Sequence, residues 1–239
     1  MAIPTFVNDD LTKLGIEVPP EMLEQLRAYL EHLLEVNQTM NLTAVRDADA
    51  AWRRLIIDSL TLLPAMADVA EDARIVDVGS GGGLPGIPLA ITRPDVQMTL
   101  METTGKKARF LESCVTKLAL TNTKVLSSRA ETAGQEKEYR QQFDVVICRG
   151  VGPMAELLEY TLPLLKVGGI LLAMKGPKVA QELEQAGDAM HILGGGEIEV
   201  LDAYPEGFEI NTVIVRVTKI AQTPKTYPRT PGTPRQFPL

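Results

Sequence analysis

A short apolar run that ends in alternating glycines is the feature that most limits the folds open to this chain. Residues 74–78 read Arg-Ile-Val-Asp-Val, and Gly79, Gly81 and Gly83 alternate directly after them. Glycine adopts positive φ easily and lets the backbone approach a ligand without a Cβ clash. A buried strand that runs into such a turn is typical of nucleoside-binding sites in α/β sheets. We therefore predict that this glycine turn binds a ligand.

Asp77, two residues before the first glycine, narrows the class of ligand. A carboxylate here would repel a pyrophosphate, whereas it suits the ammonium and sulfonium groups of S-adenosylmethionine. Residues 81–86 also spell the G-x-G-x-x-G of dinucleotide-binding folds. That fingerprint should begin directly after the strand, and counted from Gly79 its sixth position is Leu84, not glycine. We favour S-adenosylmethionine as cofactor and keep an NAD oxidoreductase as an alternative.

From residue 74 onward, short apolar runs alternate with helical patterns. We expect strands at 74–78, 97–102, 123–127, 143–148 and 169–174, and helices at 85–92, 104–119, 153–165 and 178–192. Such alternation predicts a mostly parallel sheet covered on both faces. Two further β-rich runs, 196–203 and 208–218, predict an antiparallel hairpin at its end. This α/β arrangement is that of the Rossmann-like class I methyltransferases, and it fits a plain dinucleotide fold less well.

Two segments flank this predicted domain, which we place at residues 67–218. Residues 1–66 are expected to form a helical extension packed on the core, with amphipathic helices at 19–36 and 48–63. Residues 219–239 carry several prolines and four basic residues but no acid, which predicts an extended basic tail. This tail is either solvated and disordered or an arm that lies on a phosphate backbone.

Three of the predicted strands end in residues suited to a nucleoside ligand. Glu102 follows the second strand, where a carboxylate can accept hydrogen bonds from both ribose hydroxyls; the alternative is a helix-capping acid. Ala130 and Glu131 follow the third strand and would read the adenine edge, or else begin an ordinary short helix. Arg149 ends the fourth strand and could clamp a carboxylate or a guanine edge; the alternative is a surface salt bridge.

Composition excludes several other classes of protein. There are two cysteines and no C-x-x-C pair, so neither a zinc site nor a disulfide framework is predicted. The N-terminus lacks the pattern of a signal peptide, and no apolar run approaches the roughly 18 to 20 residues of a membrane span. We therefore expect a cytoplasmic protein without a membrane partner. A net charge of -7 means that nucleic-acid binding would need a local basic patch.

Missing motifs bear on which atom would be methylated. Residues 149–153 are not the [DN]-P-P-[FYW] loop that grips an exocyclic amine, and no Pro-Cys nucleophile is present. His32 and His191 lie in helical patterns away from the strand ends, so no general base is evident. That suits an acceptor with a free lone pair and no proton to lose, such as guanine N7. Transfer would be an in-line displacement that relies on positioning and electrostatics.

Several segments together resemble the family of ribosomal RNA small subunit methyltransferase G, also called the glucose-inhibited division protein B family. The most specific are N-L-T-A-V-R-D at 41–47 and G-L-P-G-I-P-L at 83–89. Others are residues 58–59, 77–82, 105–111, 128–131, 147–149 and 174–176, and the ending 227–239. The resemblance implies S-adenosylmethionine-dependent methylation of N7 of a guanine in 16S rRNA in a bacterial cytoplasm.

The resemblance also implies a set of site residues. The cofactor would be held at Gly79, Leu84, Ala130, Glu131 and Arg149, with Glu102 at the ribose. We take Arg149 as the candidate catalytic residue and include Gly81 and Gly83 with the cofactor site. Where the family often has a histidine, this chain has Leu55, which agrees with a reaction that needs no histidine base.

Basic residues in separate segments are candidates for an RNA-facing surface. We select Arg46, Arg54, Lys175 and Arg229, with 16S rRNA or the 30S subunit as partner and the protein as a monomer. The alternatives are a methyltransferase for another RNA or a small molecule, and a non-catalytic ribosome-binding protein with the same fold.

Overall fold

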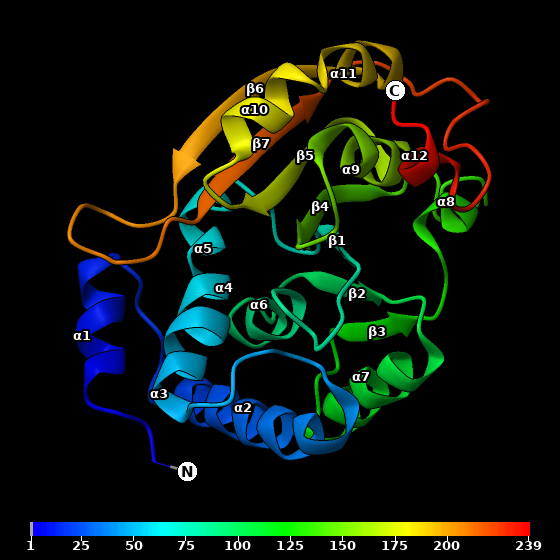
Figure 1. Cartoon of the computed structure of the whole chain (residues 1–239). Coiled ribbons are helices and arrows are strands. Elements are labelled where there is room, and N and C mark those ends of the chain that lie inside the picture. The colour runs from blue at the N-terminus through cyan, green and yellow to red at the C-terminus, as the bar shows by residue number, and fades with distance from the viewer. Residues whose placement is uncertain (1) are drawn as a thin grey trace.

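The computed structural model describes residues 2–239 and contains one seven-stranded sheet of order β3-β2-β1-β4-β5-β7-β6 (Figure 1). Strands β1 to β5 run parallel, and β7 runs antiparallel to both β5 and β6. The strands are β1 (Arg74–Val78), β2 (Gln97–Met101), β3 (Thr123–Leu126), β4 (Phe143–Arg149), β5 (Leu165–Lys175), β6 (Gly195–Asp202) and β7 (Val213–Lys219). The predicted parallel sheet with an antiparallel hairpin is confirmed.

Helices cover both faces of this sheet (Figure 1). One face carries α1 (Phe6–Lys13), α2 (Pro20–Met40), α3 (Ala48–Ala51), the π-helical η1 (Trp52–Ile57), α4 (Asp58–Leu60), α5 (Leu62–Ala65), α6 (Gly86–Thr92) and α7 (Gly105–Lys117). The other carries α8 (Ala130–Ala133), α9 (Met154–Thr161), the 3-10 turn η2 (Leu162–Leu164), α10 (Val179–Glu184) and α11 (Gly187–Leu193). The short α12 (Thr233–Gln236) lies beside α9.

The strands are buried on both sides because each contributes to two hydrophobic cores. In β1, Ile75 packs with the core under α2 and α6, whereas Val76 and Val78 pack with the core under α9. The same alternation occurs in β4 between Ile147 and Cys148. Parallel strands covered on both faces read as continuous apolar runs, which is the pattern that the sequence shows.

The N-terminal helices share the first of these cores with the sheet. Leu26, Leu30 and Leu33 of α2 are fully buried, as is Trp52 of η1. Helix α2 extends four residues past the predicted end, and α1 was not predicted. The proposed division of the chain at residue 66 stays a prediction, although no separate core is seen for the N-terminal helices among the described residues.

Several elements differ from the sequence prediction: the helix predicted at 48–63 is divided into α3, η1, α4 and α5, that at 153–165 into α9 and η2, and that at 178–192 into α10 and α11. Two further boundaries differ for clear physical reasons. Strand β5 begins at Leu165, which is buried and pairs with Phe143, while Gly168 at φ +88° interrupts the register before Ile170. The expected strand at 208–218 begins only at Val213. The preceding loop is held elsewhere, because its Tyr204 and Thr212 donate hydrogen bonds to Asp58.

The C-terminal segment differs most from expectation. Instead of an extended arm, residues 223–239 fold back against α8 and α9 and contain α12 (Figure 1). The Arg140 guanidinium donates to the carbonyl oxygens of Thr223, Pro224 and Tyr227. Tyr227 and Leu239 pack against the second core. Proline excludes long helices here but does not prevent packing.

Two absences hold for residues 2–239. No helix there combines the length and apolar character needed to cross a membrane. No group of three His, Cys, Asp or Glu side chains is arranged there as metal ligands would be.

Replacing Leu30 by alanine tests whether α2 belongs to the main folding unit. Leu30 is fully buried, and truncation of such a leucine typically costs about 2–5 kcal/mol. For Leu30→Ala we expect one cooperative urea transition, with the free energy of unfolding lowered by that amount. The partly buried control Leu34→Ala should lower it less. Separate transitions for the helices and the sheet would contradict the shared core.

Candidate cofactor site

A cavity of about 660 Å³ opens at the carboxyl ends of the first four strands. This is where open α/β sheets bind their ligands, and the volume lies in the usual range for small-molecule sites. The cavity is lined by Val78, Gly79, Met101, Thr103, Ser128, Arg129, Ala130, Glu131, Val151, Glu156, Tyr160, Gly232, Arg235 and Gln236. Chain segments far apart in the sequence therefore form one site.

The glycine turn after β1 adopts the conformation that its sequence predicts. Gly79, Gly81 and Gly83 have φ values of +74°, +56° and +93°. A Cβ on Gly79 would lie 3.1 Å from Cγ2 of Val151, so a side chain there would narrow the cavity. Gly79 lines the cavity, whereas Gly81 and Gly83 shape the turn behind it.

Asp77 lies beneath this turn and does not line the cavity. Its side chain is fully buried, and Oδ2 accepts a hydrogen bond of 3.0 Å from the Gly86 N–H at the start of α6. Oδ1 has no partner among the described residues. Burial raises the pKa of Asp77 to about 7. The sequence interpretation of Asp77 as a direct ligand selector is therefore replaced by a role in positioning the turn.

Glu102 ties the same turn to β2. Its Oε2 accepts from the Gly81 N–H at 2.9 Å, and its Oε1 accepts from the Thr104 N–H at 2.7 Å. Thr104 precedes α7, so this second bond orients the start of that helix without capping an N–H of its first turn. Each carboxylate oxygen can accept more than one hydrogen bond, so binding of ribose by Glu102 is compatible with this geometry and stays a prediction.

Ala130 and Glu131 begin α8 and face the cavity, as the adenine-edge prediction requires. Glu131 is 5% exposed, and its Oε1 accepts a hydrogen bond of 2.9 Å from the Gly232 N–H. Both the short helix and the proximity to the cavity are therefore found. The contact with the C-terminal segment was not foreseen.

Arg149 reaches the N-terminal helices instead of lining the cavity. Its guanidinium donates to Oδ2 of Asp58 at 3.2 Å and to the backbone oxygen of Arg54 at 3.1 Å. Asp58 is buried and also accepts from Tyr204 and Thr212 through Oδ1. Arg149 therefore forms a salt bridge, as the alternative interpretation expected, but its partner Asp58 is buried in a polar network and not on the surface. The position of Asp58 in an apolar helical run was the only sequence signal for this network.

Leu84 is also outside the residues that line the cavity. It is 6% exposed and packs in the core under α2 and α6, and its backbone N–H donates to Ser80. Its assignment to the cofactor site rests on the resemblance alone and stays a prediction.

Sequence reasoning missed the wall of the cavity that α9 forms. Glu156 and Tyr160 from α9 line it, and the Tyr160 hydroxyl donates to Oε1 of Glu156 at 2.7 Å. Burial, and then the neighbouring acids, raise the pKa of Tyr160. Acidic residues on the buried face of an otherwise apolar helix were the available signal, because such groups need a partner.

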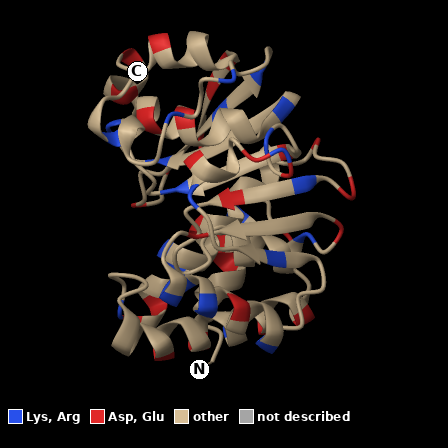
Figure 2. Cartoon of the chain, turned by 90° about the vertical axis from the view of Figure 1, so that its right-hand side faces the viewer, with Lys and Arg blue, Asp and Glu red and all other residues tan. Residues whose placement is uncertain are grey.

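Three of the four candidate RNA-binding residues make contacts within the protein. Arg46 donates to the backbone oxygen of Asn37 and to Asn41. Lys175 pairs with Glu182 and donates to the Gly152 carbonyl, and Arg229 pairs with Glu159. The side chain of Arg54 is exposed. Basic and acidic positions are interspersed along the ribbon in the view of Figure 2.

The charges of this site fit a cationic nucleoside. The acidic residues Glu102, Glu131 and Glu156 are buried in or directly behind the cavity wall. The arginines that line it, Arg129 and Arg235, are exposed. Buried carboxylates disfavour a pyrophosphate and favour a sulfonium or ammonium group. S-adenosylmethionine therefore fits this cavity better than NAD does.

The buried Asp77 predicts a specific dependence of stability on pH. The folded protein retains the proton up to about pH 7, whereas the unfolded chain releases it near 3.8. The stability that this proton contributes is complete below the unfolded value and decreases as the pH rises toward 7. Without added cofactor, the urea midpoint of the wild type should fall between pH 5 and 7.5, and Asp77→Asn should remove the share of that fall that comes from loss of the Asp77 proton. Equal pH slopes for the variant and the wild type would refute the assignment.

Comparisons with known proteins bear on the family and the fold of this chain. The family described as rRNA small subunit methyltransferase G matches residues 22–205. A protein of that name from Moorella thermoacetica is 41% identical over 94% of this chain and 93% of its own length. A protein of the same name from Chloroflexus aggregans is 41% identical over 95% of this chain and 94% of its own length.

Solved structures share the fold at lower identity. A putative S-adenosyl-L-methionine-dependent methyltransferase from Methanococcus maripaludis has a TM-score of 0.57 and 13% identity, over 81% of this chain and 93% of that one. M. jannaschii TYW2, solved in complex with AdoMet, has a TM-score of 0.51 and 19% identity. The match covers 68% of this chain and 77% of that one. The fold is therefore that of the class I methyltransferases, and the chain belongs to the family of ribosomal RNA small subunit methyltransferase G.

Proposed function

We propose that this chain transfers a methyl group from S-adenosylmethionine to N7 of a guanine in 16S rRNA. Family membership establishes an S-adenosylmethionine-dependent methyltransferase of small-subunit rRNA. The methylated atom goes beyond that assignment. The observation that supports N7 most directly is the absence of a histidine from the described lining of the cavity.

An N7 acceptor makes few demands on proton transfer. When bound, the cofactor supplies an electrophilic methyl group on a sulfonium. The guanine N7 lone pair would form the new C–N bond, the electrons of the broken C–S bond would stay on the sulfur of the leaving S-adenosylhomocysteine, and no proton would have to leave the base. The work left to the protein is positioning and electrostatic stabilisation. The glycine turn, Glu102 and the α8 residues Ala130 and Glu131 would hold the nucleoside of the cofactor.

Arg149 is our candidate for orienting the reacting groups. Arg149 ends β4, two residues before Val151 of the cavity wall, and its pairing with Asp58 fixes the guanidinium. A planar guanidinium can bind a carboxylate or a guanine edge with two parallel hydrogen bonds. We propose that Arg149 supplies this clamp to the cofactor carboxylate or to the target guanine.

The partner and the setting complete the proposal. The relatives named for small-subunit rRNA support 16S rRNA, free or in the 30S subunit, as the substrate. We propose a cytoplasmic monomer in which residues 67–218 form the methyltransferase domain. The exposed Arg54 is the best-placed of the candidate RNA contacts, since Arg46, Lys175 and Arg229 are engaged within the protein.

Transfer of a labelled methyl group tests the proposed product. Unmethylated 16S rRNA and 30S subunits are each incubated with the protein and tritiated S-adenosylmethionine, and the label is mapped after borohydride reduction and aniline cleavage. We expect label at one guanine whose chain cleaves under these conditions, as N7-methylguanosine does. Label on a carbon or an exocyclic amine, or none with either RNA, would contradict the proposal.

Replacement of Arg149 by alanine tests its role. Loss of a preorganised charged contact typically lowers turnover by roughly 100-fold or more, and we expect a loss of that order in methyl transfer. Arg216→Ala is the matched control, because Arg216 also lies on a strand, pairs with acids and is 25% exposed, against 23% for Arg149. Turnover of Arg149→Ala near that of the control, at equal thermal midpoints, would exclude an essential role.

A further inference from the structure

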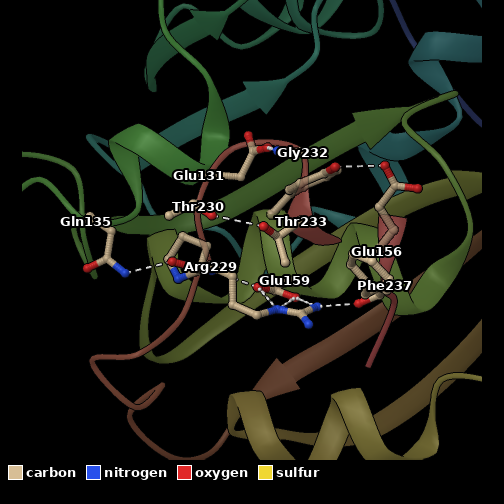
Figure 3. A network of polar contacts seen from close by, with 11 residues as sticks. Glu131, Gln135, Glu156, Glu159, Arg229, Thr230, Gly232, Thr233 and Phe237 are labelled. Carbon is tan, nitrogen blue, oxygen red and sulfur yellow. Dashed lines mark hydrogen bonds and ion pairs between the residues drawn. The ribbon is translucent and has the colours of Figure 1, made fainter. Parts of the chain in front are cut away.

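The C-terminal segment reaches the cofactor cavity, although its sequence is typical of a solvent-exposed tail. Gly232, Arg235 and Gln236 line the cavity together with residues of β1, β2, α8 and α9. Figure 3 shows residues 229–237 crossing beside α9, with Glu131 on one side and Glu159 on the other. The segment thus stands where a ligand in the cavity would meet it.

A buried ion pair fixes the start of this segment. The Arg229 guanidinium donates from Nε to Oε1 of Glu159 at 3.0 Å and from Nη2 to Oε2 at 2.6 Å, and the Arg229 backbone N–H donates to Oε1 at 2.7 Å (Figure 3). The side chain of Glu159 is 1% exposed. Displacing the segment would leave this carboxylate buried without its partner, which is strongly unfavourable. Nη2 also donates to the carbonyl of Phe237, which closes residues 229–237 into a loop.

A second contact joins this loop to the adenine-edge residues. Gly232, at φ +88°, donates its N–H to Oε1 of Glu131 at 2.9 Å, and α12 starts directly after it (Figure 3). The hydroxyls of Thr230 and Thr233 lie 2.9 Å apart and brace the turn. Because Glu131 follows Ala130 at the start of α8, the loop closes the cavity at the end predicted to hold adenine.

We propose that residues 230–236 form a fixed wall of the S-adenosylmethionine site at its adenine end. Arg235 and Gln236 contact the cofactor, and Arg229, held by Glu159, is the positioning residue that sets the wall. The wall then determines cofactor affinity, in place of the RNA contact that the basic sequence predicted for Arg229. This inference rests on the cofactor of the proposed function, but not on which RNA atom is methylated.

Calorimetric binding of S-adenosylhomocysteine to the full chain tests the wall without RNA. The variant Arg235→Ala/Gln236→Ala should raise the dissociation constant by roughly tenfold, the effect of losing one or two polar contacts. Both side chains are exposed, so the thermal midpoint without ligand should not change. Lys225→Ala is the control, because it removes a charge from an exposed segment residue outside the cavity lining and should leave the constant within twofold.

Equal dissociation constants for the double variant and the wild type would contradict the proposed wall. A wild type that binds no S-adenosylhomocysteine would contradict the proposed function itself. Filter binding to 16S rRNA at several salt concentrations tests the alternative, in which the segment binds RNA and not the cofactor. If the double variant lost RNA affinity and salt dependence with unchanged cofactor affinity, the segment would be an RNA arm and the proposal would be wrong.

The positioning role of Arg229 needs a separate measurement, because Arg229→Ala could lower stability alone. Lysine keeps the charge but not the two-pronged geometry. We expect the KM for S-adenosylmethionine to rise in the order wild type, Arg229→Lys, Arg229→Ala, with kcat changed by less than about twofold. If both variants had a lowered thermal midpoint and an unchanged KM, the Arg229–Glu159 pair would contribute to stability alone. That result would contradict this part of the proposal.

Discussion

The hydrogen bond from the Gly86 N–H to the buried carboxylate of Asp77 is the contact on which the rest of the site depends. It joins the end of β1 to the start of α6 across the glycine turn. Glu102 ties the middle of that turn to β2, and the Tyr29 hydroxyl donates to the Gly82 carbonyl from α2. The turn is thus anchored from a helix and two strands, so its backbone is set before any ligand arrives.

Buried carboxylates recur around the cavity, and each holds a different segment in place. Glu131 binds the C-terminal loop, Glu159 binds Arg229, and Asp58 binds Arg149 together with the loop before β7. A buried carboxylate without a partner is costly, so each of these contacts is enforced by the packing around it. One type of interaction therefore assembles the site, while Glu102, Glu131 and Glu156 give its interior an acidic character suited to a cationic cofactor.

The sequence predicts the parts of the molecule that depend on local patterns. The run 74–78, the alternating glycines and the later β-α repeats correspond to β1, the turn and the sheet, because periodicity and glycine conformation are local properties. The partner of Arg149 could not be predicted, since Asp58 is far away in the sequence and its burial is a tertiary property. The C-terminal segment was misjudged for the same reason. Its prolines and charges indicate an open chain, while the buried acceptors that hold it belong to α8 and α9.

A crystal structure of the full chain with S-adenosylhomocysteine tests the central claim most directly. The account predicts the adenosine in the cavity bounded by Gly79, by Ala130 and Glu131, and by residues 230–236, with the Arg229–Glu159 pair intact. A ligand seated elsewhere would contradict it, for example in the separate cavity lined by Arg53, Arg54 and Glu206. So would a ligand in the predicted cavity with residues 230–236 displaced from it.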